Sequence, residues 1–528
     1  MIPKRAASTG AILMLAVLGL SACGQQAETP SEAGDVSVSF SNIAETQTLD
    51  PAIAFSSDGL EFVRNVYDSL TAYDVGGVTI GPSIASEWEM NDDATEYTFT
   101  LEEGITFHDG TGLTADDVVS SIERVKAINQ GPATLITGIE SVTASDDLTV
   151  VVSLSAPDVY LPGRLQKIAI VSGDAVEENA TTEDPWATDW FAANEAGSGP
   201  YVLDEWNRGT AIELSAFEDY RLPWEDGAPT RVTLRTDPDV QTALQLMQQG
   251  EIDMMGAVGP DDSMAASAMD GVKLVEQSAL SVKVLPLNTA NEALQDVRVR
   301  EAITLAFDYE AFDEYYQGFA QTAVGPLPSG FGGGLEDLAP KERDVERATQ
   351  LLEEAGYGDG LSLTFMGISG LSYEEFAATL LEQNLGEIGI DLELNMVPWP
   401  QMVEIQSNPE SAADITFLDM SAVSDDPSAM LAQSYLSTNI APNGGYNWSY
   451  YQNPEVDAAI QALSSITDEG ERQQAVLDTV DLINSEFLAI YGTQPSLAQP
   501  VLDTWKVAYE PMDYNYVVRF FYARSTGS

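Results

Sequence analysis

Histidine and cysteine are almost absent from this chain, which has one of each, His108 and Cys23, among its 528 residues. A lone cysteine cannot form a disulfide within the chain. A Ser-His-Asp triad also lacks support, because His108 stands in an expected Asp-Gly turn and neither a G-x-S-x-G elbow nor a phosphate-binding glycine loop occurs. Neighbouring carboxylates such as Asp116 and Asp117 are common in so acidic a chain, so they do not indicate acid–base catalysis. The sequence offers no catalytic set for a hydrolase.

Basic residues are also scarce, since 22 Lys and Arg stand against 84 Asp and Glu, a net charge of −62. This charge argues against binding to nucleic acid, or to an anionic membrane surface, through a basic patch. The acidic residues are scattered along the chain, which is typical of a solvated acidic surface in an exposed or saline setting. With 44% hydrophobic residues, the chain is expected to fold as a globular protein of two or three domains.

The N-terminus carries a targeting signal. Lys4 and Arg5 precede the apolar run 11–20, which is too short to span a bilayer. The run ends in Leu-Ser-Ala-Cys, which resembles the bacterial lipobox and implies that Cys23 receives lipid and becomes the first mature residue. We therefore expect a signal peptide at 1–22 and a lipidated, flexible tether at 23–34. No later stretch is apolar enough to cross a membrane, so the body is expected outside the cytoplasmic membrane and anchored by lipid.

Strand and helix signals alternate along the rest of the chain, which predicts an α/β fold. Alternating apolar residues from Val36 to Phe40 predict a strand. The segment 96–110 is interpreted as two strands separated by 102–104 and closed by an Asp-Gly turn. Thr114 and Asp117 then predict a capped helix.

The C-terminal half contains further helix and strand signals. Asp296 and Asp344 stand at expected N-caps, Gly356 at an expected C-cap, and Ser372 with Glu375 at an expected capping box. Strands are predicted at 361–368 and 390–397, and a domain boundary near 287–293.

The run LEEGITFHDGTGLTADDVVSSIERV, at 101–125, closely resembles the signature of the family 5 extracytoplasmic solute-binding proteins of ABC importers, which include the oligopeptide- and dipeptide-binding proteins. Further elements typical of this family follow in its order: Leu49-Asp50-Pro51, PSIASEW at 82, GSGPYVLDEW at 197, GEIDM at 250, LNT at 287, DVRVREAITLAFD at 296, LLEEAGY at 351 and YQNPEVDAAI at 451. Within this resemblance, His108, Asp109 and Gly110 are expected to hold a turn rather than bind ligand.

The resemblance implies a three-lobed periplasmic-binding-protein-like fold (type II, cluster C). Its ligand cleft lies between lobes I and III, which close on the ligand by a hinge motion. The expected boundaries are 35–80, 197–286 and 491–528 for lobe I, 81–196 for lobe II and 287–490 for lobe III.

The resemblance also implies ligand contacts. In peptide-binding relatives, the segment after Leu-Asp-Pro pairs with an extended peptide through its backbone. From lobe III, relatives supply an aspartate for the peptide ammonium, but here Met420 and Val423 occupy the usual Trp and Asp positions. Asp419 or Asp425 could replace that aspartate. The candidate ligand-binding residues are Phe55, Ser56, Ser57, Asp58, Trp399, Met420, Ser421, Ala422, Val423, Asn443, Tyr446 and Trp448.

The function implied is a monomeric, non-enzymatic receptor that delivers a solute, with peptide the default, to ABC permease subunits. A non-peptide solute such as a sugar, an opine or a chelated metal is an alternative, because the aspartate position has changed. A secreted enzyme and a signalling receptor are further alternatives, because a fold does not dictate its use. No cofactor is expected, and direct metal ligation is nearly excluded, since His108 is the only histidine and Cys23 is used for lipid.

Overall fold

A computed structural model describes residues 36–42, 44–73, 79–237, 239–278, 280–409, 411–422, 424–507 and 517–526. Asp35–Ser528 form one compact unit, separate from Met1–Gly34. The predicted signal peptide, Cys23 and the tether all lie outside the described residues. In the part of the chain that the structure describes, no helix is long and apolar enough to cross a membrane.

The largest sheet in the described chain has ten strands and joins segments from both ends of the sequence. Its order is β18-β13-β19-β11-β1-β10-β9-β8, with β12 and β14 also paired to β19. The strands are β1 (Ser37–Asn42), β8 (Tyr201–Asn207), β9 (Ala211–Ala216), β10 (Arg231–Thr236), β11 (Met254–Met255), β12 (Val272–Ser278), β13 (Ser281–Pro286), β14 (Ala320–Thr322), β18 (Leu418–Ser421) and β19 (Ala489–Leu502). The predicted strand near Val38 is confirmed as β1.

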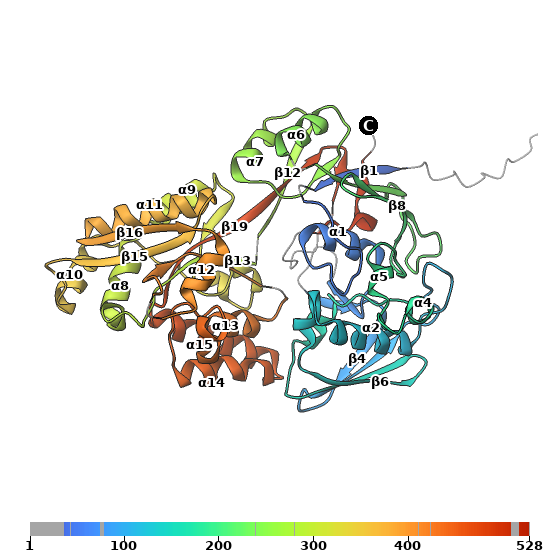
Figure 1. The fold of residues 1–528 in the computed structure, drawn as a ribbon, viewed down its shortest axis with the longest axis horizontal. Coiled ribbons are helices and arrows are strands. Elements are labelled where there is room, and N and C mark those ends of the chain that lie inside the picture. The colour runs from blue at the N-terminus through green and yellow to red at the C-terminus, as the bar shows by residue number, and fades with distance from the viewer. Residues whose placement is uncertain are drawn as a thin grey trace, which may run out of the picture. The chain divides into compact units, whose positions relative to one another are not determined.

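Strand β19 links the lobes. Its first half pairs with β13 and β14, and its second half pairs with β11 and β12. Figure 1 shows this long strand running between lobe III, at the left, and the part of lobe I that holds β12. Lobe I also contains α1 (Ser57–Val66), α6 (Val240–Gln248), α7 (Pro260–Ser267), and the short strands β2 (Thr71–Tyr73), β3 (Ile80–Pro82), β20 (Trp505–Lys506) and β21 (Arg524–Ser525).

Lobe II is built on a four-stranded antiparallel sheet, in the order β4-β5-β7-β6 within the described residues. Its elements are β4 (Ala85–Met90), β5 (Glu96–Leu101), α2 (Ala115–Ile128), β6 (Ile139–Asp146), β7 (Thr149–Leu154), α3 (Leu161–Leu165), α4 (Gly173–Asn179) and α5 (Thr188–Phe191). Asp117 accepts hydrogen bonds from the N–H and hydroxyl of Thr114, which confirms the predicted capping interaction. The second strand expected after Gly104 is wrong, because only an isolated bridge joins Thr106 to Gly112.

Lobe III pairs a parallel sheet with surrounding helices. Its elements are α8 (Val297–Ala306), α9 (Tyr309–Tyr315), α10 (Val345–Ala355), β15 (Leu361–Ile368), α11 (Ser372–Glu387), β16 (Ile390–Val397), α12 (Trp399–Gln406), β17 (Ile415–Thr416), α13 (Pro427–Tyr435), α14 (Pro454–Ala462) and α15 (Glu469–Ser485). The N-caps Asp296 and Asp344 and the left-handed C-cap Gly356 are confirmed. The predicted capping box at Ser372 is wrong, because Leu371 is the N-cap and Ser372 is already helical.

The hydrophobic core is divided into several clusters, and some of them cross the predicted lobe boundaries. One is centred on Phe40 and Tyr201, a second on Phe99 and Ile122, and a third on Phe307. The predicted α/β class is confirmed, while the lobe boundaries stay predictions.

Candidate functional site

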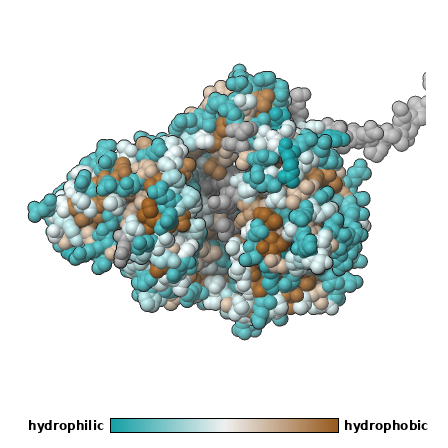
Figure 2. Space-filling model, viewed as in Figure 1, coloured by the Kyte–Doolittle hydropathy of each residue, from teal (hydrophilic) through white to brown (hydrophobic). Residues whose placement is uncertain are grey.

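A cavity of about 530 Å³ lies between lobes I and III. Lobe I contributes the start of α1 and the loop 256–260, and lobe III contributes Tyr316 and Tyr373. Residues 495–499 of β19 also line it, so the shared strand forms part of the wall. Figure 2 shows the surface hollowed between lobe III and the other two lobes. The cavity therefore lies where motion of one lobe against another would change its width.

Among the buried polar atoms of this cavity without a hydrogen-bond partner in the described residues, two belong to opposite lobes. They are Oδ2 of Asp58, on lobe I, and the hydroxyl of Tyr316, on lobe III. Each side chain belongs to a residue only 7% exposed. Burial raises the pKa of Tyr316, and the charge of Asp419 adds to the shift, so its hydroxyl stays protonated. Because buried polar groups normally pair, both atoms lack a partner that such groups are expected to have.

One lysine approaches the cavity from β13. Lys283 pairs with Asp419 of β18, and its Nζ lies 5.0 Å from the ring centroid of Tyr373. Ser281 and Ser421 also donate hydrogen bonds to Asp419. The only cation lining the cavity in the described chain is thus already neutralised by a neighbouring carboxylate.

A second cavity, of about 330 Å³, lies in lobe III and shares Tyr373 with the first. Met420 and Ser421 of β18 line it, together with Trp399 and Tyr446. The rings of Trp399, Tyr446 and Trp448 are nearly parallel, with interplanar angles of 10° to 21° and centroids 5.6 to 6.5 Å apart. Such a surface suits stacking against a flat or apolar group.

Glu374 lines the second cavity from α11 and is only 2% exposed. Burial raises its pKa to about 7, although the N–H of Ile368 and the charge of Lys283 oppose the shift. The carboxyl group accepts a hydrogen bond of 2.6 Å from that N–H. The second cavity therefore contains a carboxyl group that changes charge near neutral pH.

The predicted lobe I residues are placed differently from one another. Ser56, Ser57 and Asp58 line the first cavity. Phe55 instead packs against the hydrophobic cluster of lobe II.

The predicted lobe III residues also separate into groups. Trp399, Met420, Ser421 and Tyr446 line the second cavity. Three others line neither cavity. Ala422 and Trp448 are buried in a further hydrophobic cluster, which also contains Met420 and Tyr491, and Asn443 is exposed and donates to the carbonyl of Thr438. Val423 lies outside the described residues.

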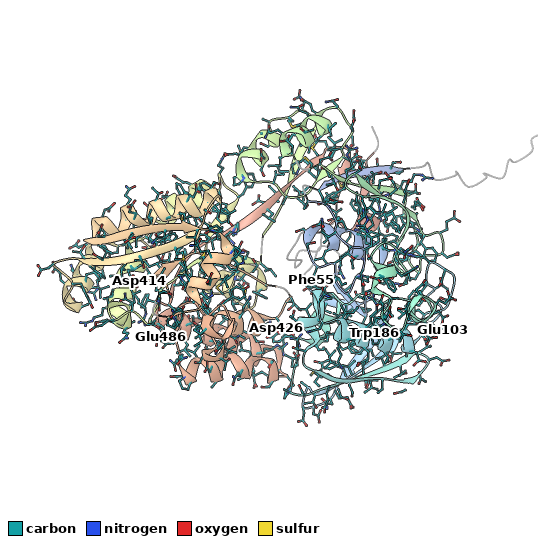
Figure 3. All side chains as sticks on the ribbon, viewed as in Figure 1. Phe55, Glu103, Trp186, Asp414, Asp426 and Glu486 are labelled. Carbon is teal, nitrogen blue, oxygen red and sulfur yellow. The ribbon has the colours of Figure 1, made fainter. Side chains whose placement is uncertain are left out.

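Asp425 and Asp426 face lobe II instead of the first cavity. Arg164 of lobe II pairs with Asp426 at 2.7 Å and with Asp158. The close approach of Asp425 leaves no room for a side chain at Gly163. Burial raises the pKa of Asp425 to about 6, and the charge of Asp426 adds to the shift. Figure 3 labels Asp426, at the side of lobe III that is nearest to lobe II, and Phe55.

His108 is held by the scaffold, as expected. Its Nδ1 lies 2.9 Å from the carboxylate of Glu195, and its Nε2 lies 2.9 Å from the carbonyl oxygen of Gly199. Burial lowers its pKa, but Glu195, the Gly199 carbonyl and Asp68 together raise it above its ordinary value. Both nitrogens face acceptors, so the ring serves as a double donor. Among the described residues, no cluster of three His, Cys, Asp or Glu could hold a metal ion.

Sequence reasoning missed Lys283, Tyr316, Tyr373 and Glu374. Lys283 gave one usable signal, because it is a lone charge in the apolar run 282–287 of a chain with few basic residues. The others sit on helices or loops whose patterns do not distinguish cavity walls from ordinary packing.

Comparisons with known proteins agree with this architecture. The family model "Bacterial extracellular solute-binding proteins, family 5 Middle" matches residues 79–442. The chain is 28% identical over 450 residues to the probable D,D-dipeptide-binding periplasmic protein DdpA of Escherichia coli (strain K12), covering 83% of this chain and 85% of that protein. It is also 28% identical over 437 residues to heme-binding protein A of Haemophilus influenzae (strain ATCC 51907 / DSM 11121 / KW20 / Rd), covering 78% of each.

Among solved structures, HbpA2 from Haemophilus parasuis has the same fold, with a TM-score of 0.83 at 21% identity. The alignment covers 93% of this chain and 99% of that one. The three-lobed binding-protein fold predicted from the sequence motifs is thereby confirmed. The chain belongs to the family 5 bacterial extracellular solute-binding proteins, a family of binding proteins and not of enzymes.

Proposed function

We propose that this protein captures a peptide in the cleft between lobes I and III and delivers it to the permease of an ABC importer. The observation that carries this proposal is the cavity of about 530 Å³ whose walls come from both lobes. The D,D-dipeptide specificity named for the Escherichia coli relative supports peptide as the solute class.

Main-chain pairing is the proposed source of affinity. Strand β18 is at the edge of the ten-stranded sheet, and in the described chain it pairs with β13 alone. Its residues line the second cavity, while Ser56 and Ser57 line the first. An extended peptide could add to such an edge as a further strand, which gives affinity without selecting side chains.

The second cavity is the proposed pocket for a peptide side chain. Trp399 and Tyr446 offer aromatic faces, and Met420 offers an adaptable thioether. An aromatic or long aliphatic side chain fits this lining. Ala422, Val423, Asn443 and Trp448 remain predicted ligand-binding residues.

Closure is the proposed signal to the permease. A ligand that contacts both lobes binds the closed state more tightly and so increases its population. Strands β13 and β19 belong to the sheet that joins the lobes, which makes their junctions the proposed hinge. We retain the lobe boundaries 35–80, 81–196, 197–286, 287–490 and 491–528 as part of this proposal.

The N-terminal segment is the proposed anchor. Residues 1–22 would be removed as a signal peptide, and Cys23 would carry lipid at the start of the tether, with the protein acting as a monomer. Replacing Cys23 with serine tests this: the variant should leave the membrane fraction and lose the lipid mass from its N-terminal peptide. A variant that keeps both would contradict the proposal.

A non-peptide solute is the second candidate, favoured by the three near-parallel rings of Trp399, Tyr446 and Trp448. Trp399 and Tyr446, which line the second cavity, could stack against a planar compound, and heme is named for the Haemophilus influenzae relative. Native mass spectrometry of the protein, followed by denaturation and identification of the released compounds, separates the two candidates. A spread of short peptides supports peptide capture, whereas one planar compound favours the second candidate. Chemically altered compounds after incubation would contradict a binding role.

A further inference from the structure

We infer that Asp58 holds a cationic nitrogen of the ligand, a role that rests on ligand capture in the proposed cleft. The family resemblance implies only that the segment containing Asp58 pairs with a peptide through its backbone. The structure assigns its side chain a role of its own, because Asp58 lines the cavity and one oxygen of its carboxylate is buried without a partner.

The burial of Asp58 is the first step. The residue is 93% removed from solvent, and its Oδ2 makes no hydrogen bond to the described residues. A buried carboxylate oxygen without a partner is unfavourable, so such atoms are expected to meet a ligand or an ion. A charged N–H donor would satisfy it with a short, strong hydrogen bond.

The balance of charge in the cavity is the second step. Two carboxylates, Asp58 and Glu61, line it from lobe I. In the described chain, the single lining cation is Lys283, which is neutralised by Asp419. The buried, unpaired carboxylate of Asp58 therefore favours a positively charged group over an anionic one at this part of the lining.

The alternatives for an ammonium site are weaker. Asp419 is engaged by Lys283, Ser281 and Ser421. Asp425 lies against Gly163 of lobe II, and it does not line either large cavity. Of these three aspartates, Asp58 alone combines burial, an unpaired oxygen and a place in the first cavity.

Tyr316 completes the arrangement from the opposite lobe. Its buried hydroxyl also lacks a partner among the described residues and lines the same cavity. A ligand whose cation meets Asp58 and whose neighbouring carbonyl accepts from Tyr316 would contact both lobes. This geometry couples recognition of the cation to closure.

The test uses the full chain purified in detergent and two matched probes, a defined mixture of tripeptides with free amino termini and the same mixture N-acetylated. Binding is measured by titration calorimetry for wild type, Asp58→Asn, Asp419→Asn and Asp116→Asn. Asp116 is a matched control, because it is an exposed first-turn aspartate of α2 outside both cavity linings.

Wild type should prefer the free amines by about tenfold or more, and Asp58→Asn should remove that preference while Asp116→Asn keeps it. The thermal midpoint of Asp58→Asn without ligand should match or exceed that of wild type, because a buried unpaired charge is removed. A preference lost in Asp419→Asn but kept in Asp58→Asn would overturn the inference and leave peptide capture intact.

The compounds that co-purify with the protein separate the two proposals. If wild type binds neither mixture but carries a cationic non-peptide compound that Asp58→Asn loses, peptide capture fails and the role of Asp58 stands. A co-purified compound without a cationic nitrogen, retained by Asp58→Asn, would overturn that role.

Discussion

The buried ion pair between Asp50 and Arg124 should be one of the most destabilising places to substitute this protein. The two side chains are 0% and 1% exposed, and two hydrogen bonds of 2.7 Å join the guanidinium to the carboxylate. Arg124 also donates to the carbonyl of Trp186 at 2.9 Å and lies over the ring of Phe191. Asp50 belongs to lobe I and Arg124 to α2, so the pair fixes lobe II to lobe I.

Arg124→Met keeps much of the side-chain volume but strands the Asp50 carboxylate in the interior. Removing one partner of a buried pair costs about 3–5 kcal/mol, mainly because the remaining charge is uncompensated. Asp50→Asn should cost a similar amount, because it leaves the buried positive charge of Arg124 uncompensated. The double variant should be less destabilised than the sum of the two, because no charge is left unpaired, with a coupling free energy of about 2 kcal/mol or more.

Urea unfolding followed by tryptophan fluorescence measures this cycle, with the same buffer and salt for all variants. Arg347→Met is the control, because its pair with Glu354 is 3.2 Å long and both side chains are exposed. That control should change the free energy of unfolding by about 0.5 kcal/mol or less. Additive costs in the cycle, or an Arg124→Met cost no larger than the control, would refute the reasoning.

Three further predictions concern pH, and thermal midpoints between pH 4 and 9 test each of them. The pKa of Asp425 is raised to about 6, so the folded protein binds this proton more tightly than the unfolded chain does. The resulting contribution to the free energy of unfolding is fully present below pH 3.8, the ordinary pKa, and is lost as pH rises through 6. Asp425→Asn should thus gain up to about 3 kcal/mol at pH 8 and nothing at pH 4, and an equal gain at both would contradict this. Glu374→Gln should also gain stability over wild type as pH rises, here between pH 4.5, the ordinary pKa of Glu374, and about pH 7. A variant less stable than wild type at pH 8 would contradict this. The pKa of His108 is raised above 6.5, so its stabilising contribution is present below 6.5 and is lost as pH rises through the folded value. His108→Gln should be most destabilised, by about 1–3 kcal/mol, at pH 5 and least at pH 9. A loss of stability that does not vary with pH would show that His108 stabilises the fold through its shape and not through its charge.

Local signals predicted many elements correctly. The helices after Asp296 and Asp344 and the strand β15 begin where side-chain caps and alternating apolar residues indicated. These features depend on residues within a few positions of one another, so they can be recognised without knowing the fold. The capping box at Ser372 failed, because the helix begins one residue earlier than expected: Leu371 is the N-cap, and its carbonyl accepts hydrogen bonds from the N–H groups of Glu374 and Glu375.

The site depends on contacts that are distant in sequence. Lys283 and Asp419 are separated by 136 residues, and Arg164 and Asp426 by 262. The residues next to each partner in the sequence give no indication that either pair forms. The family motifs placed the cleft correctly between two lobes, but only the structure separates Asp58, which faces the cavity, from Asp425, which faces lobe II.

The shared strand β19 also constrains when the protein can fold. Strand β1, near the start of the chain, pairs with β11, and β11 pairs with Val501 near the end. Strand β19 also pairs with β13 and β14, so the central sheet of both lobes lacks one of its strands until residues 489–502 have been made. Contacts this distant in sequence form slowly. The central sheet is therefore expected to stay unformed, and its strands dependent on protection from aggregation, until β19 has been made.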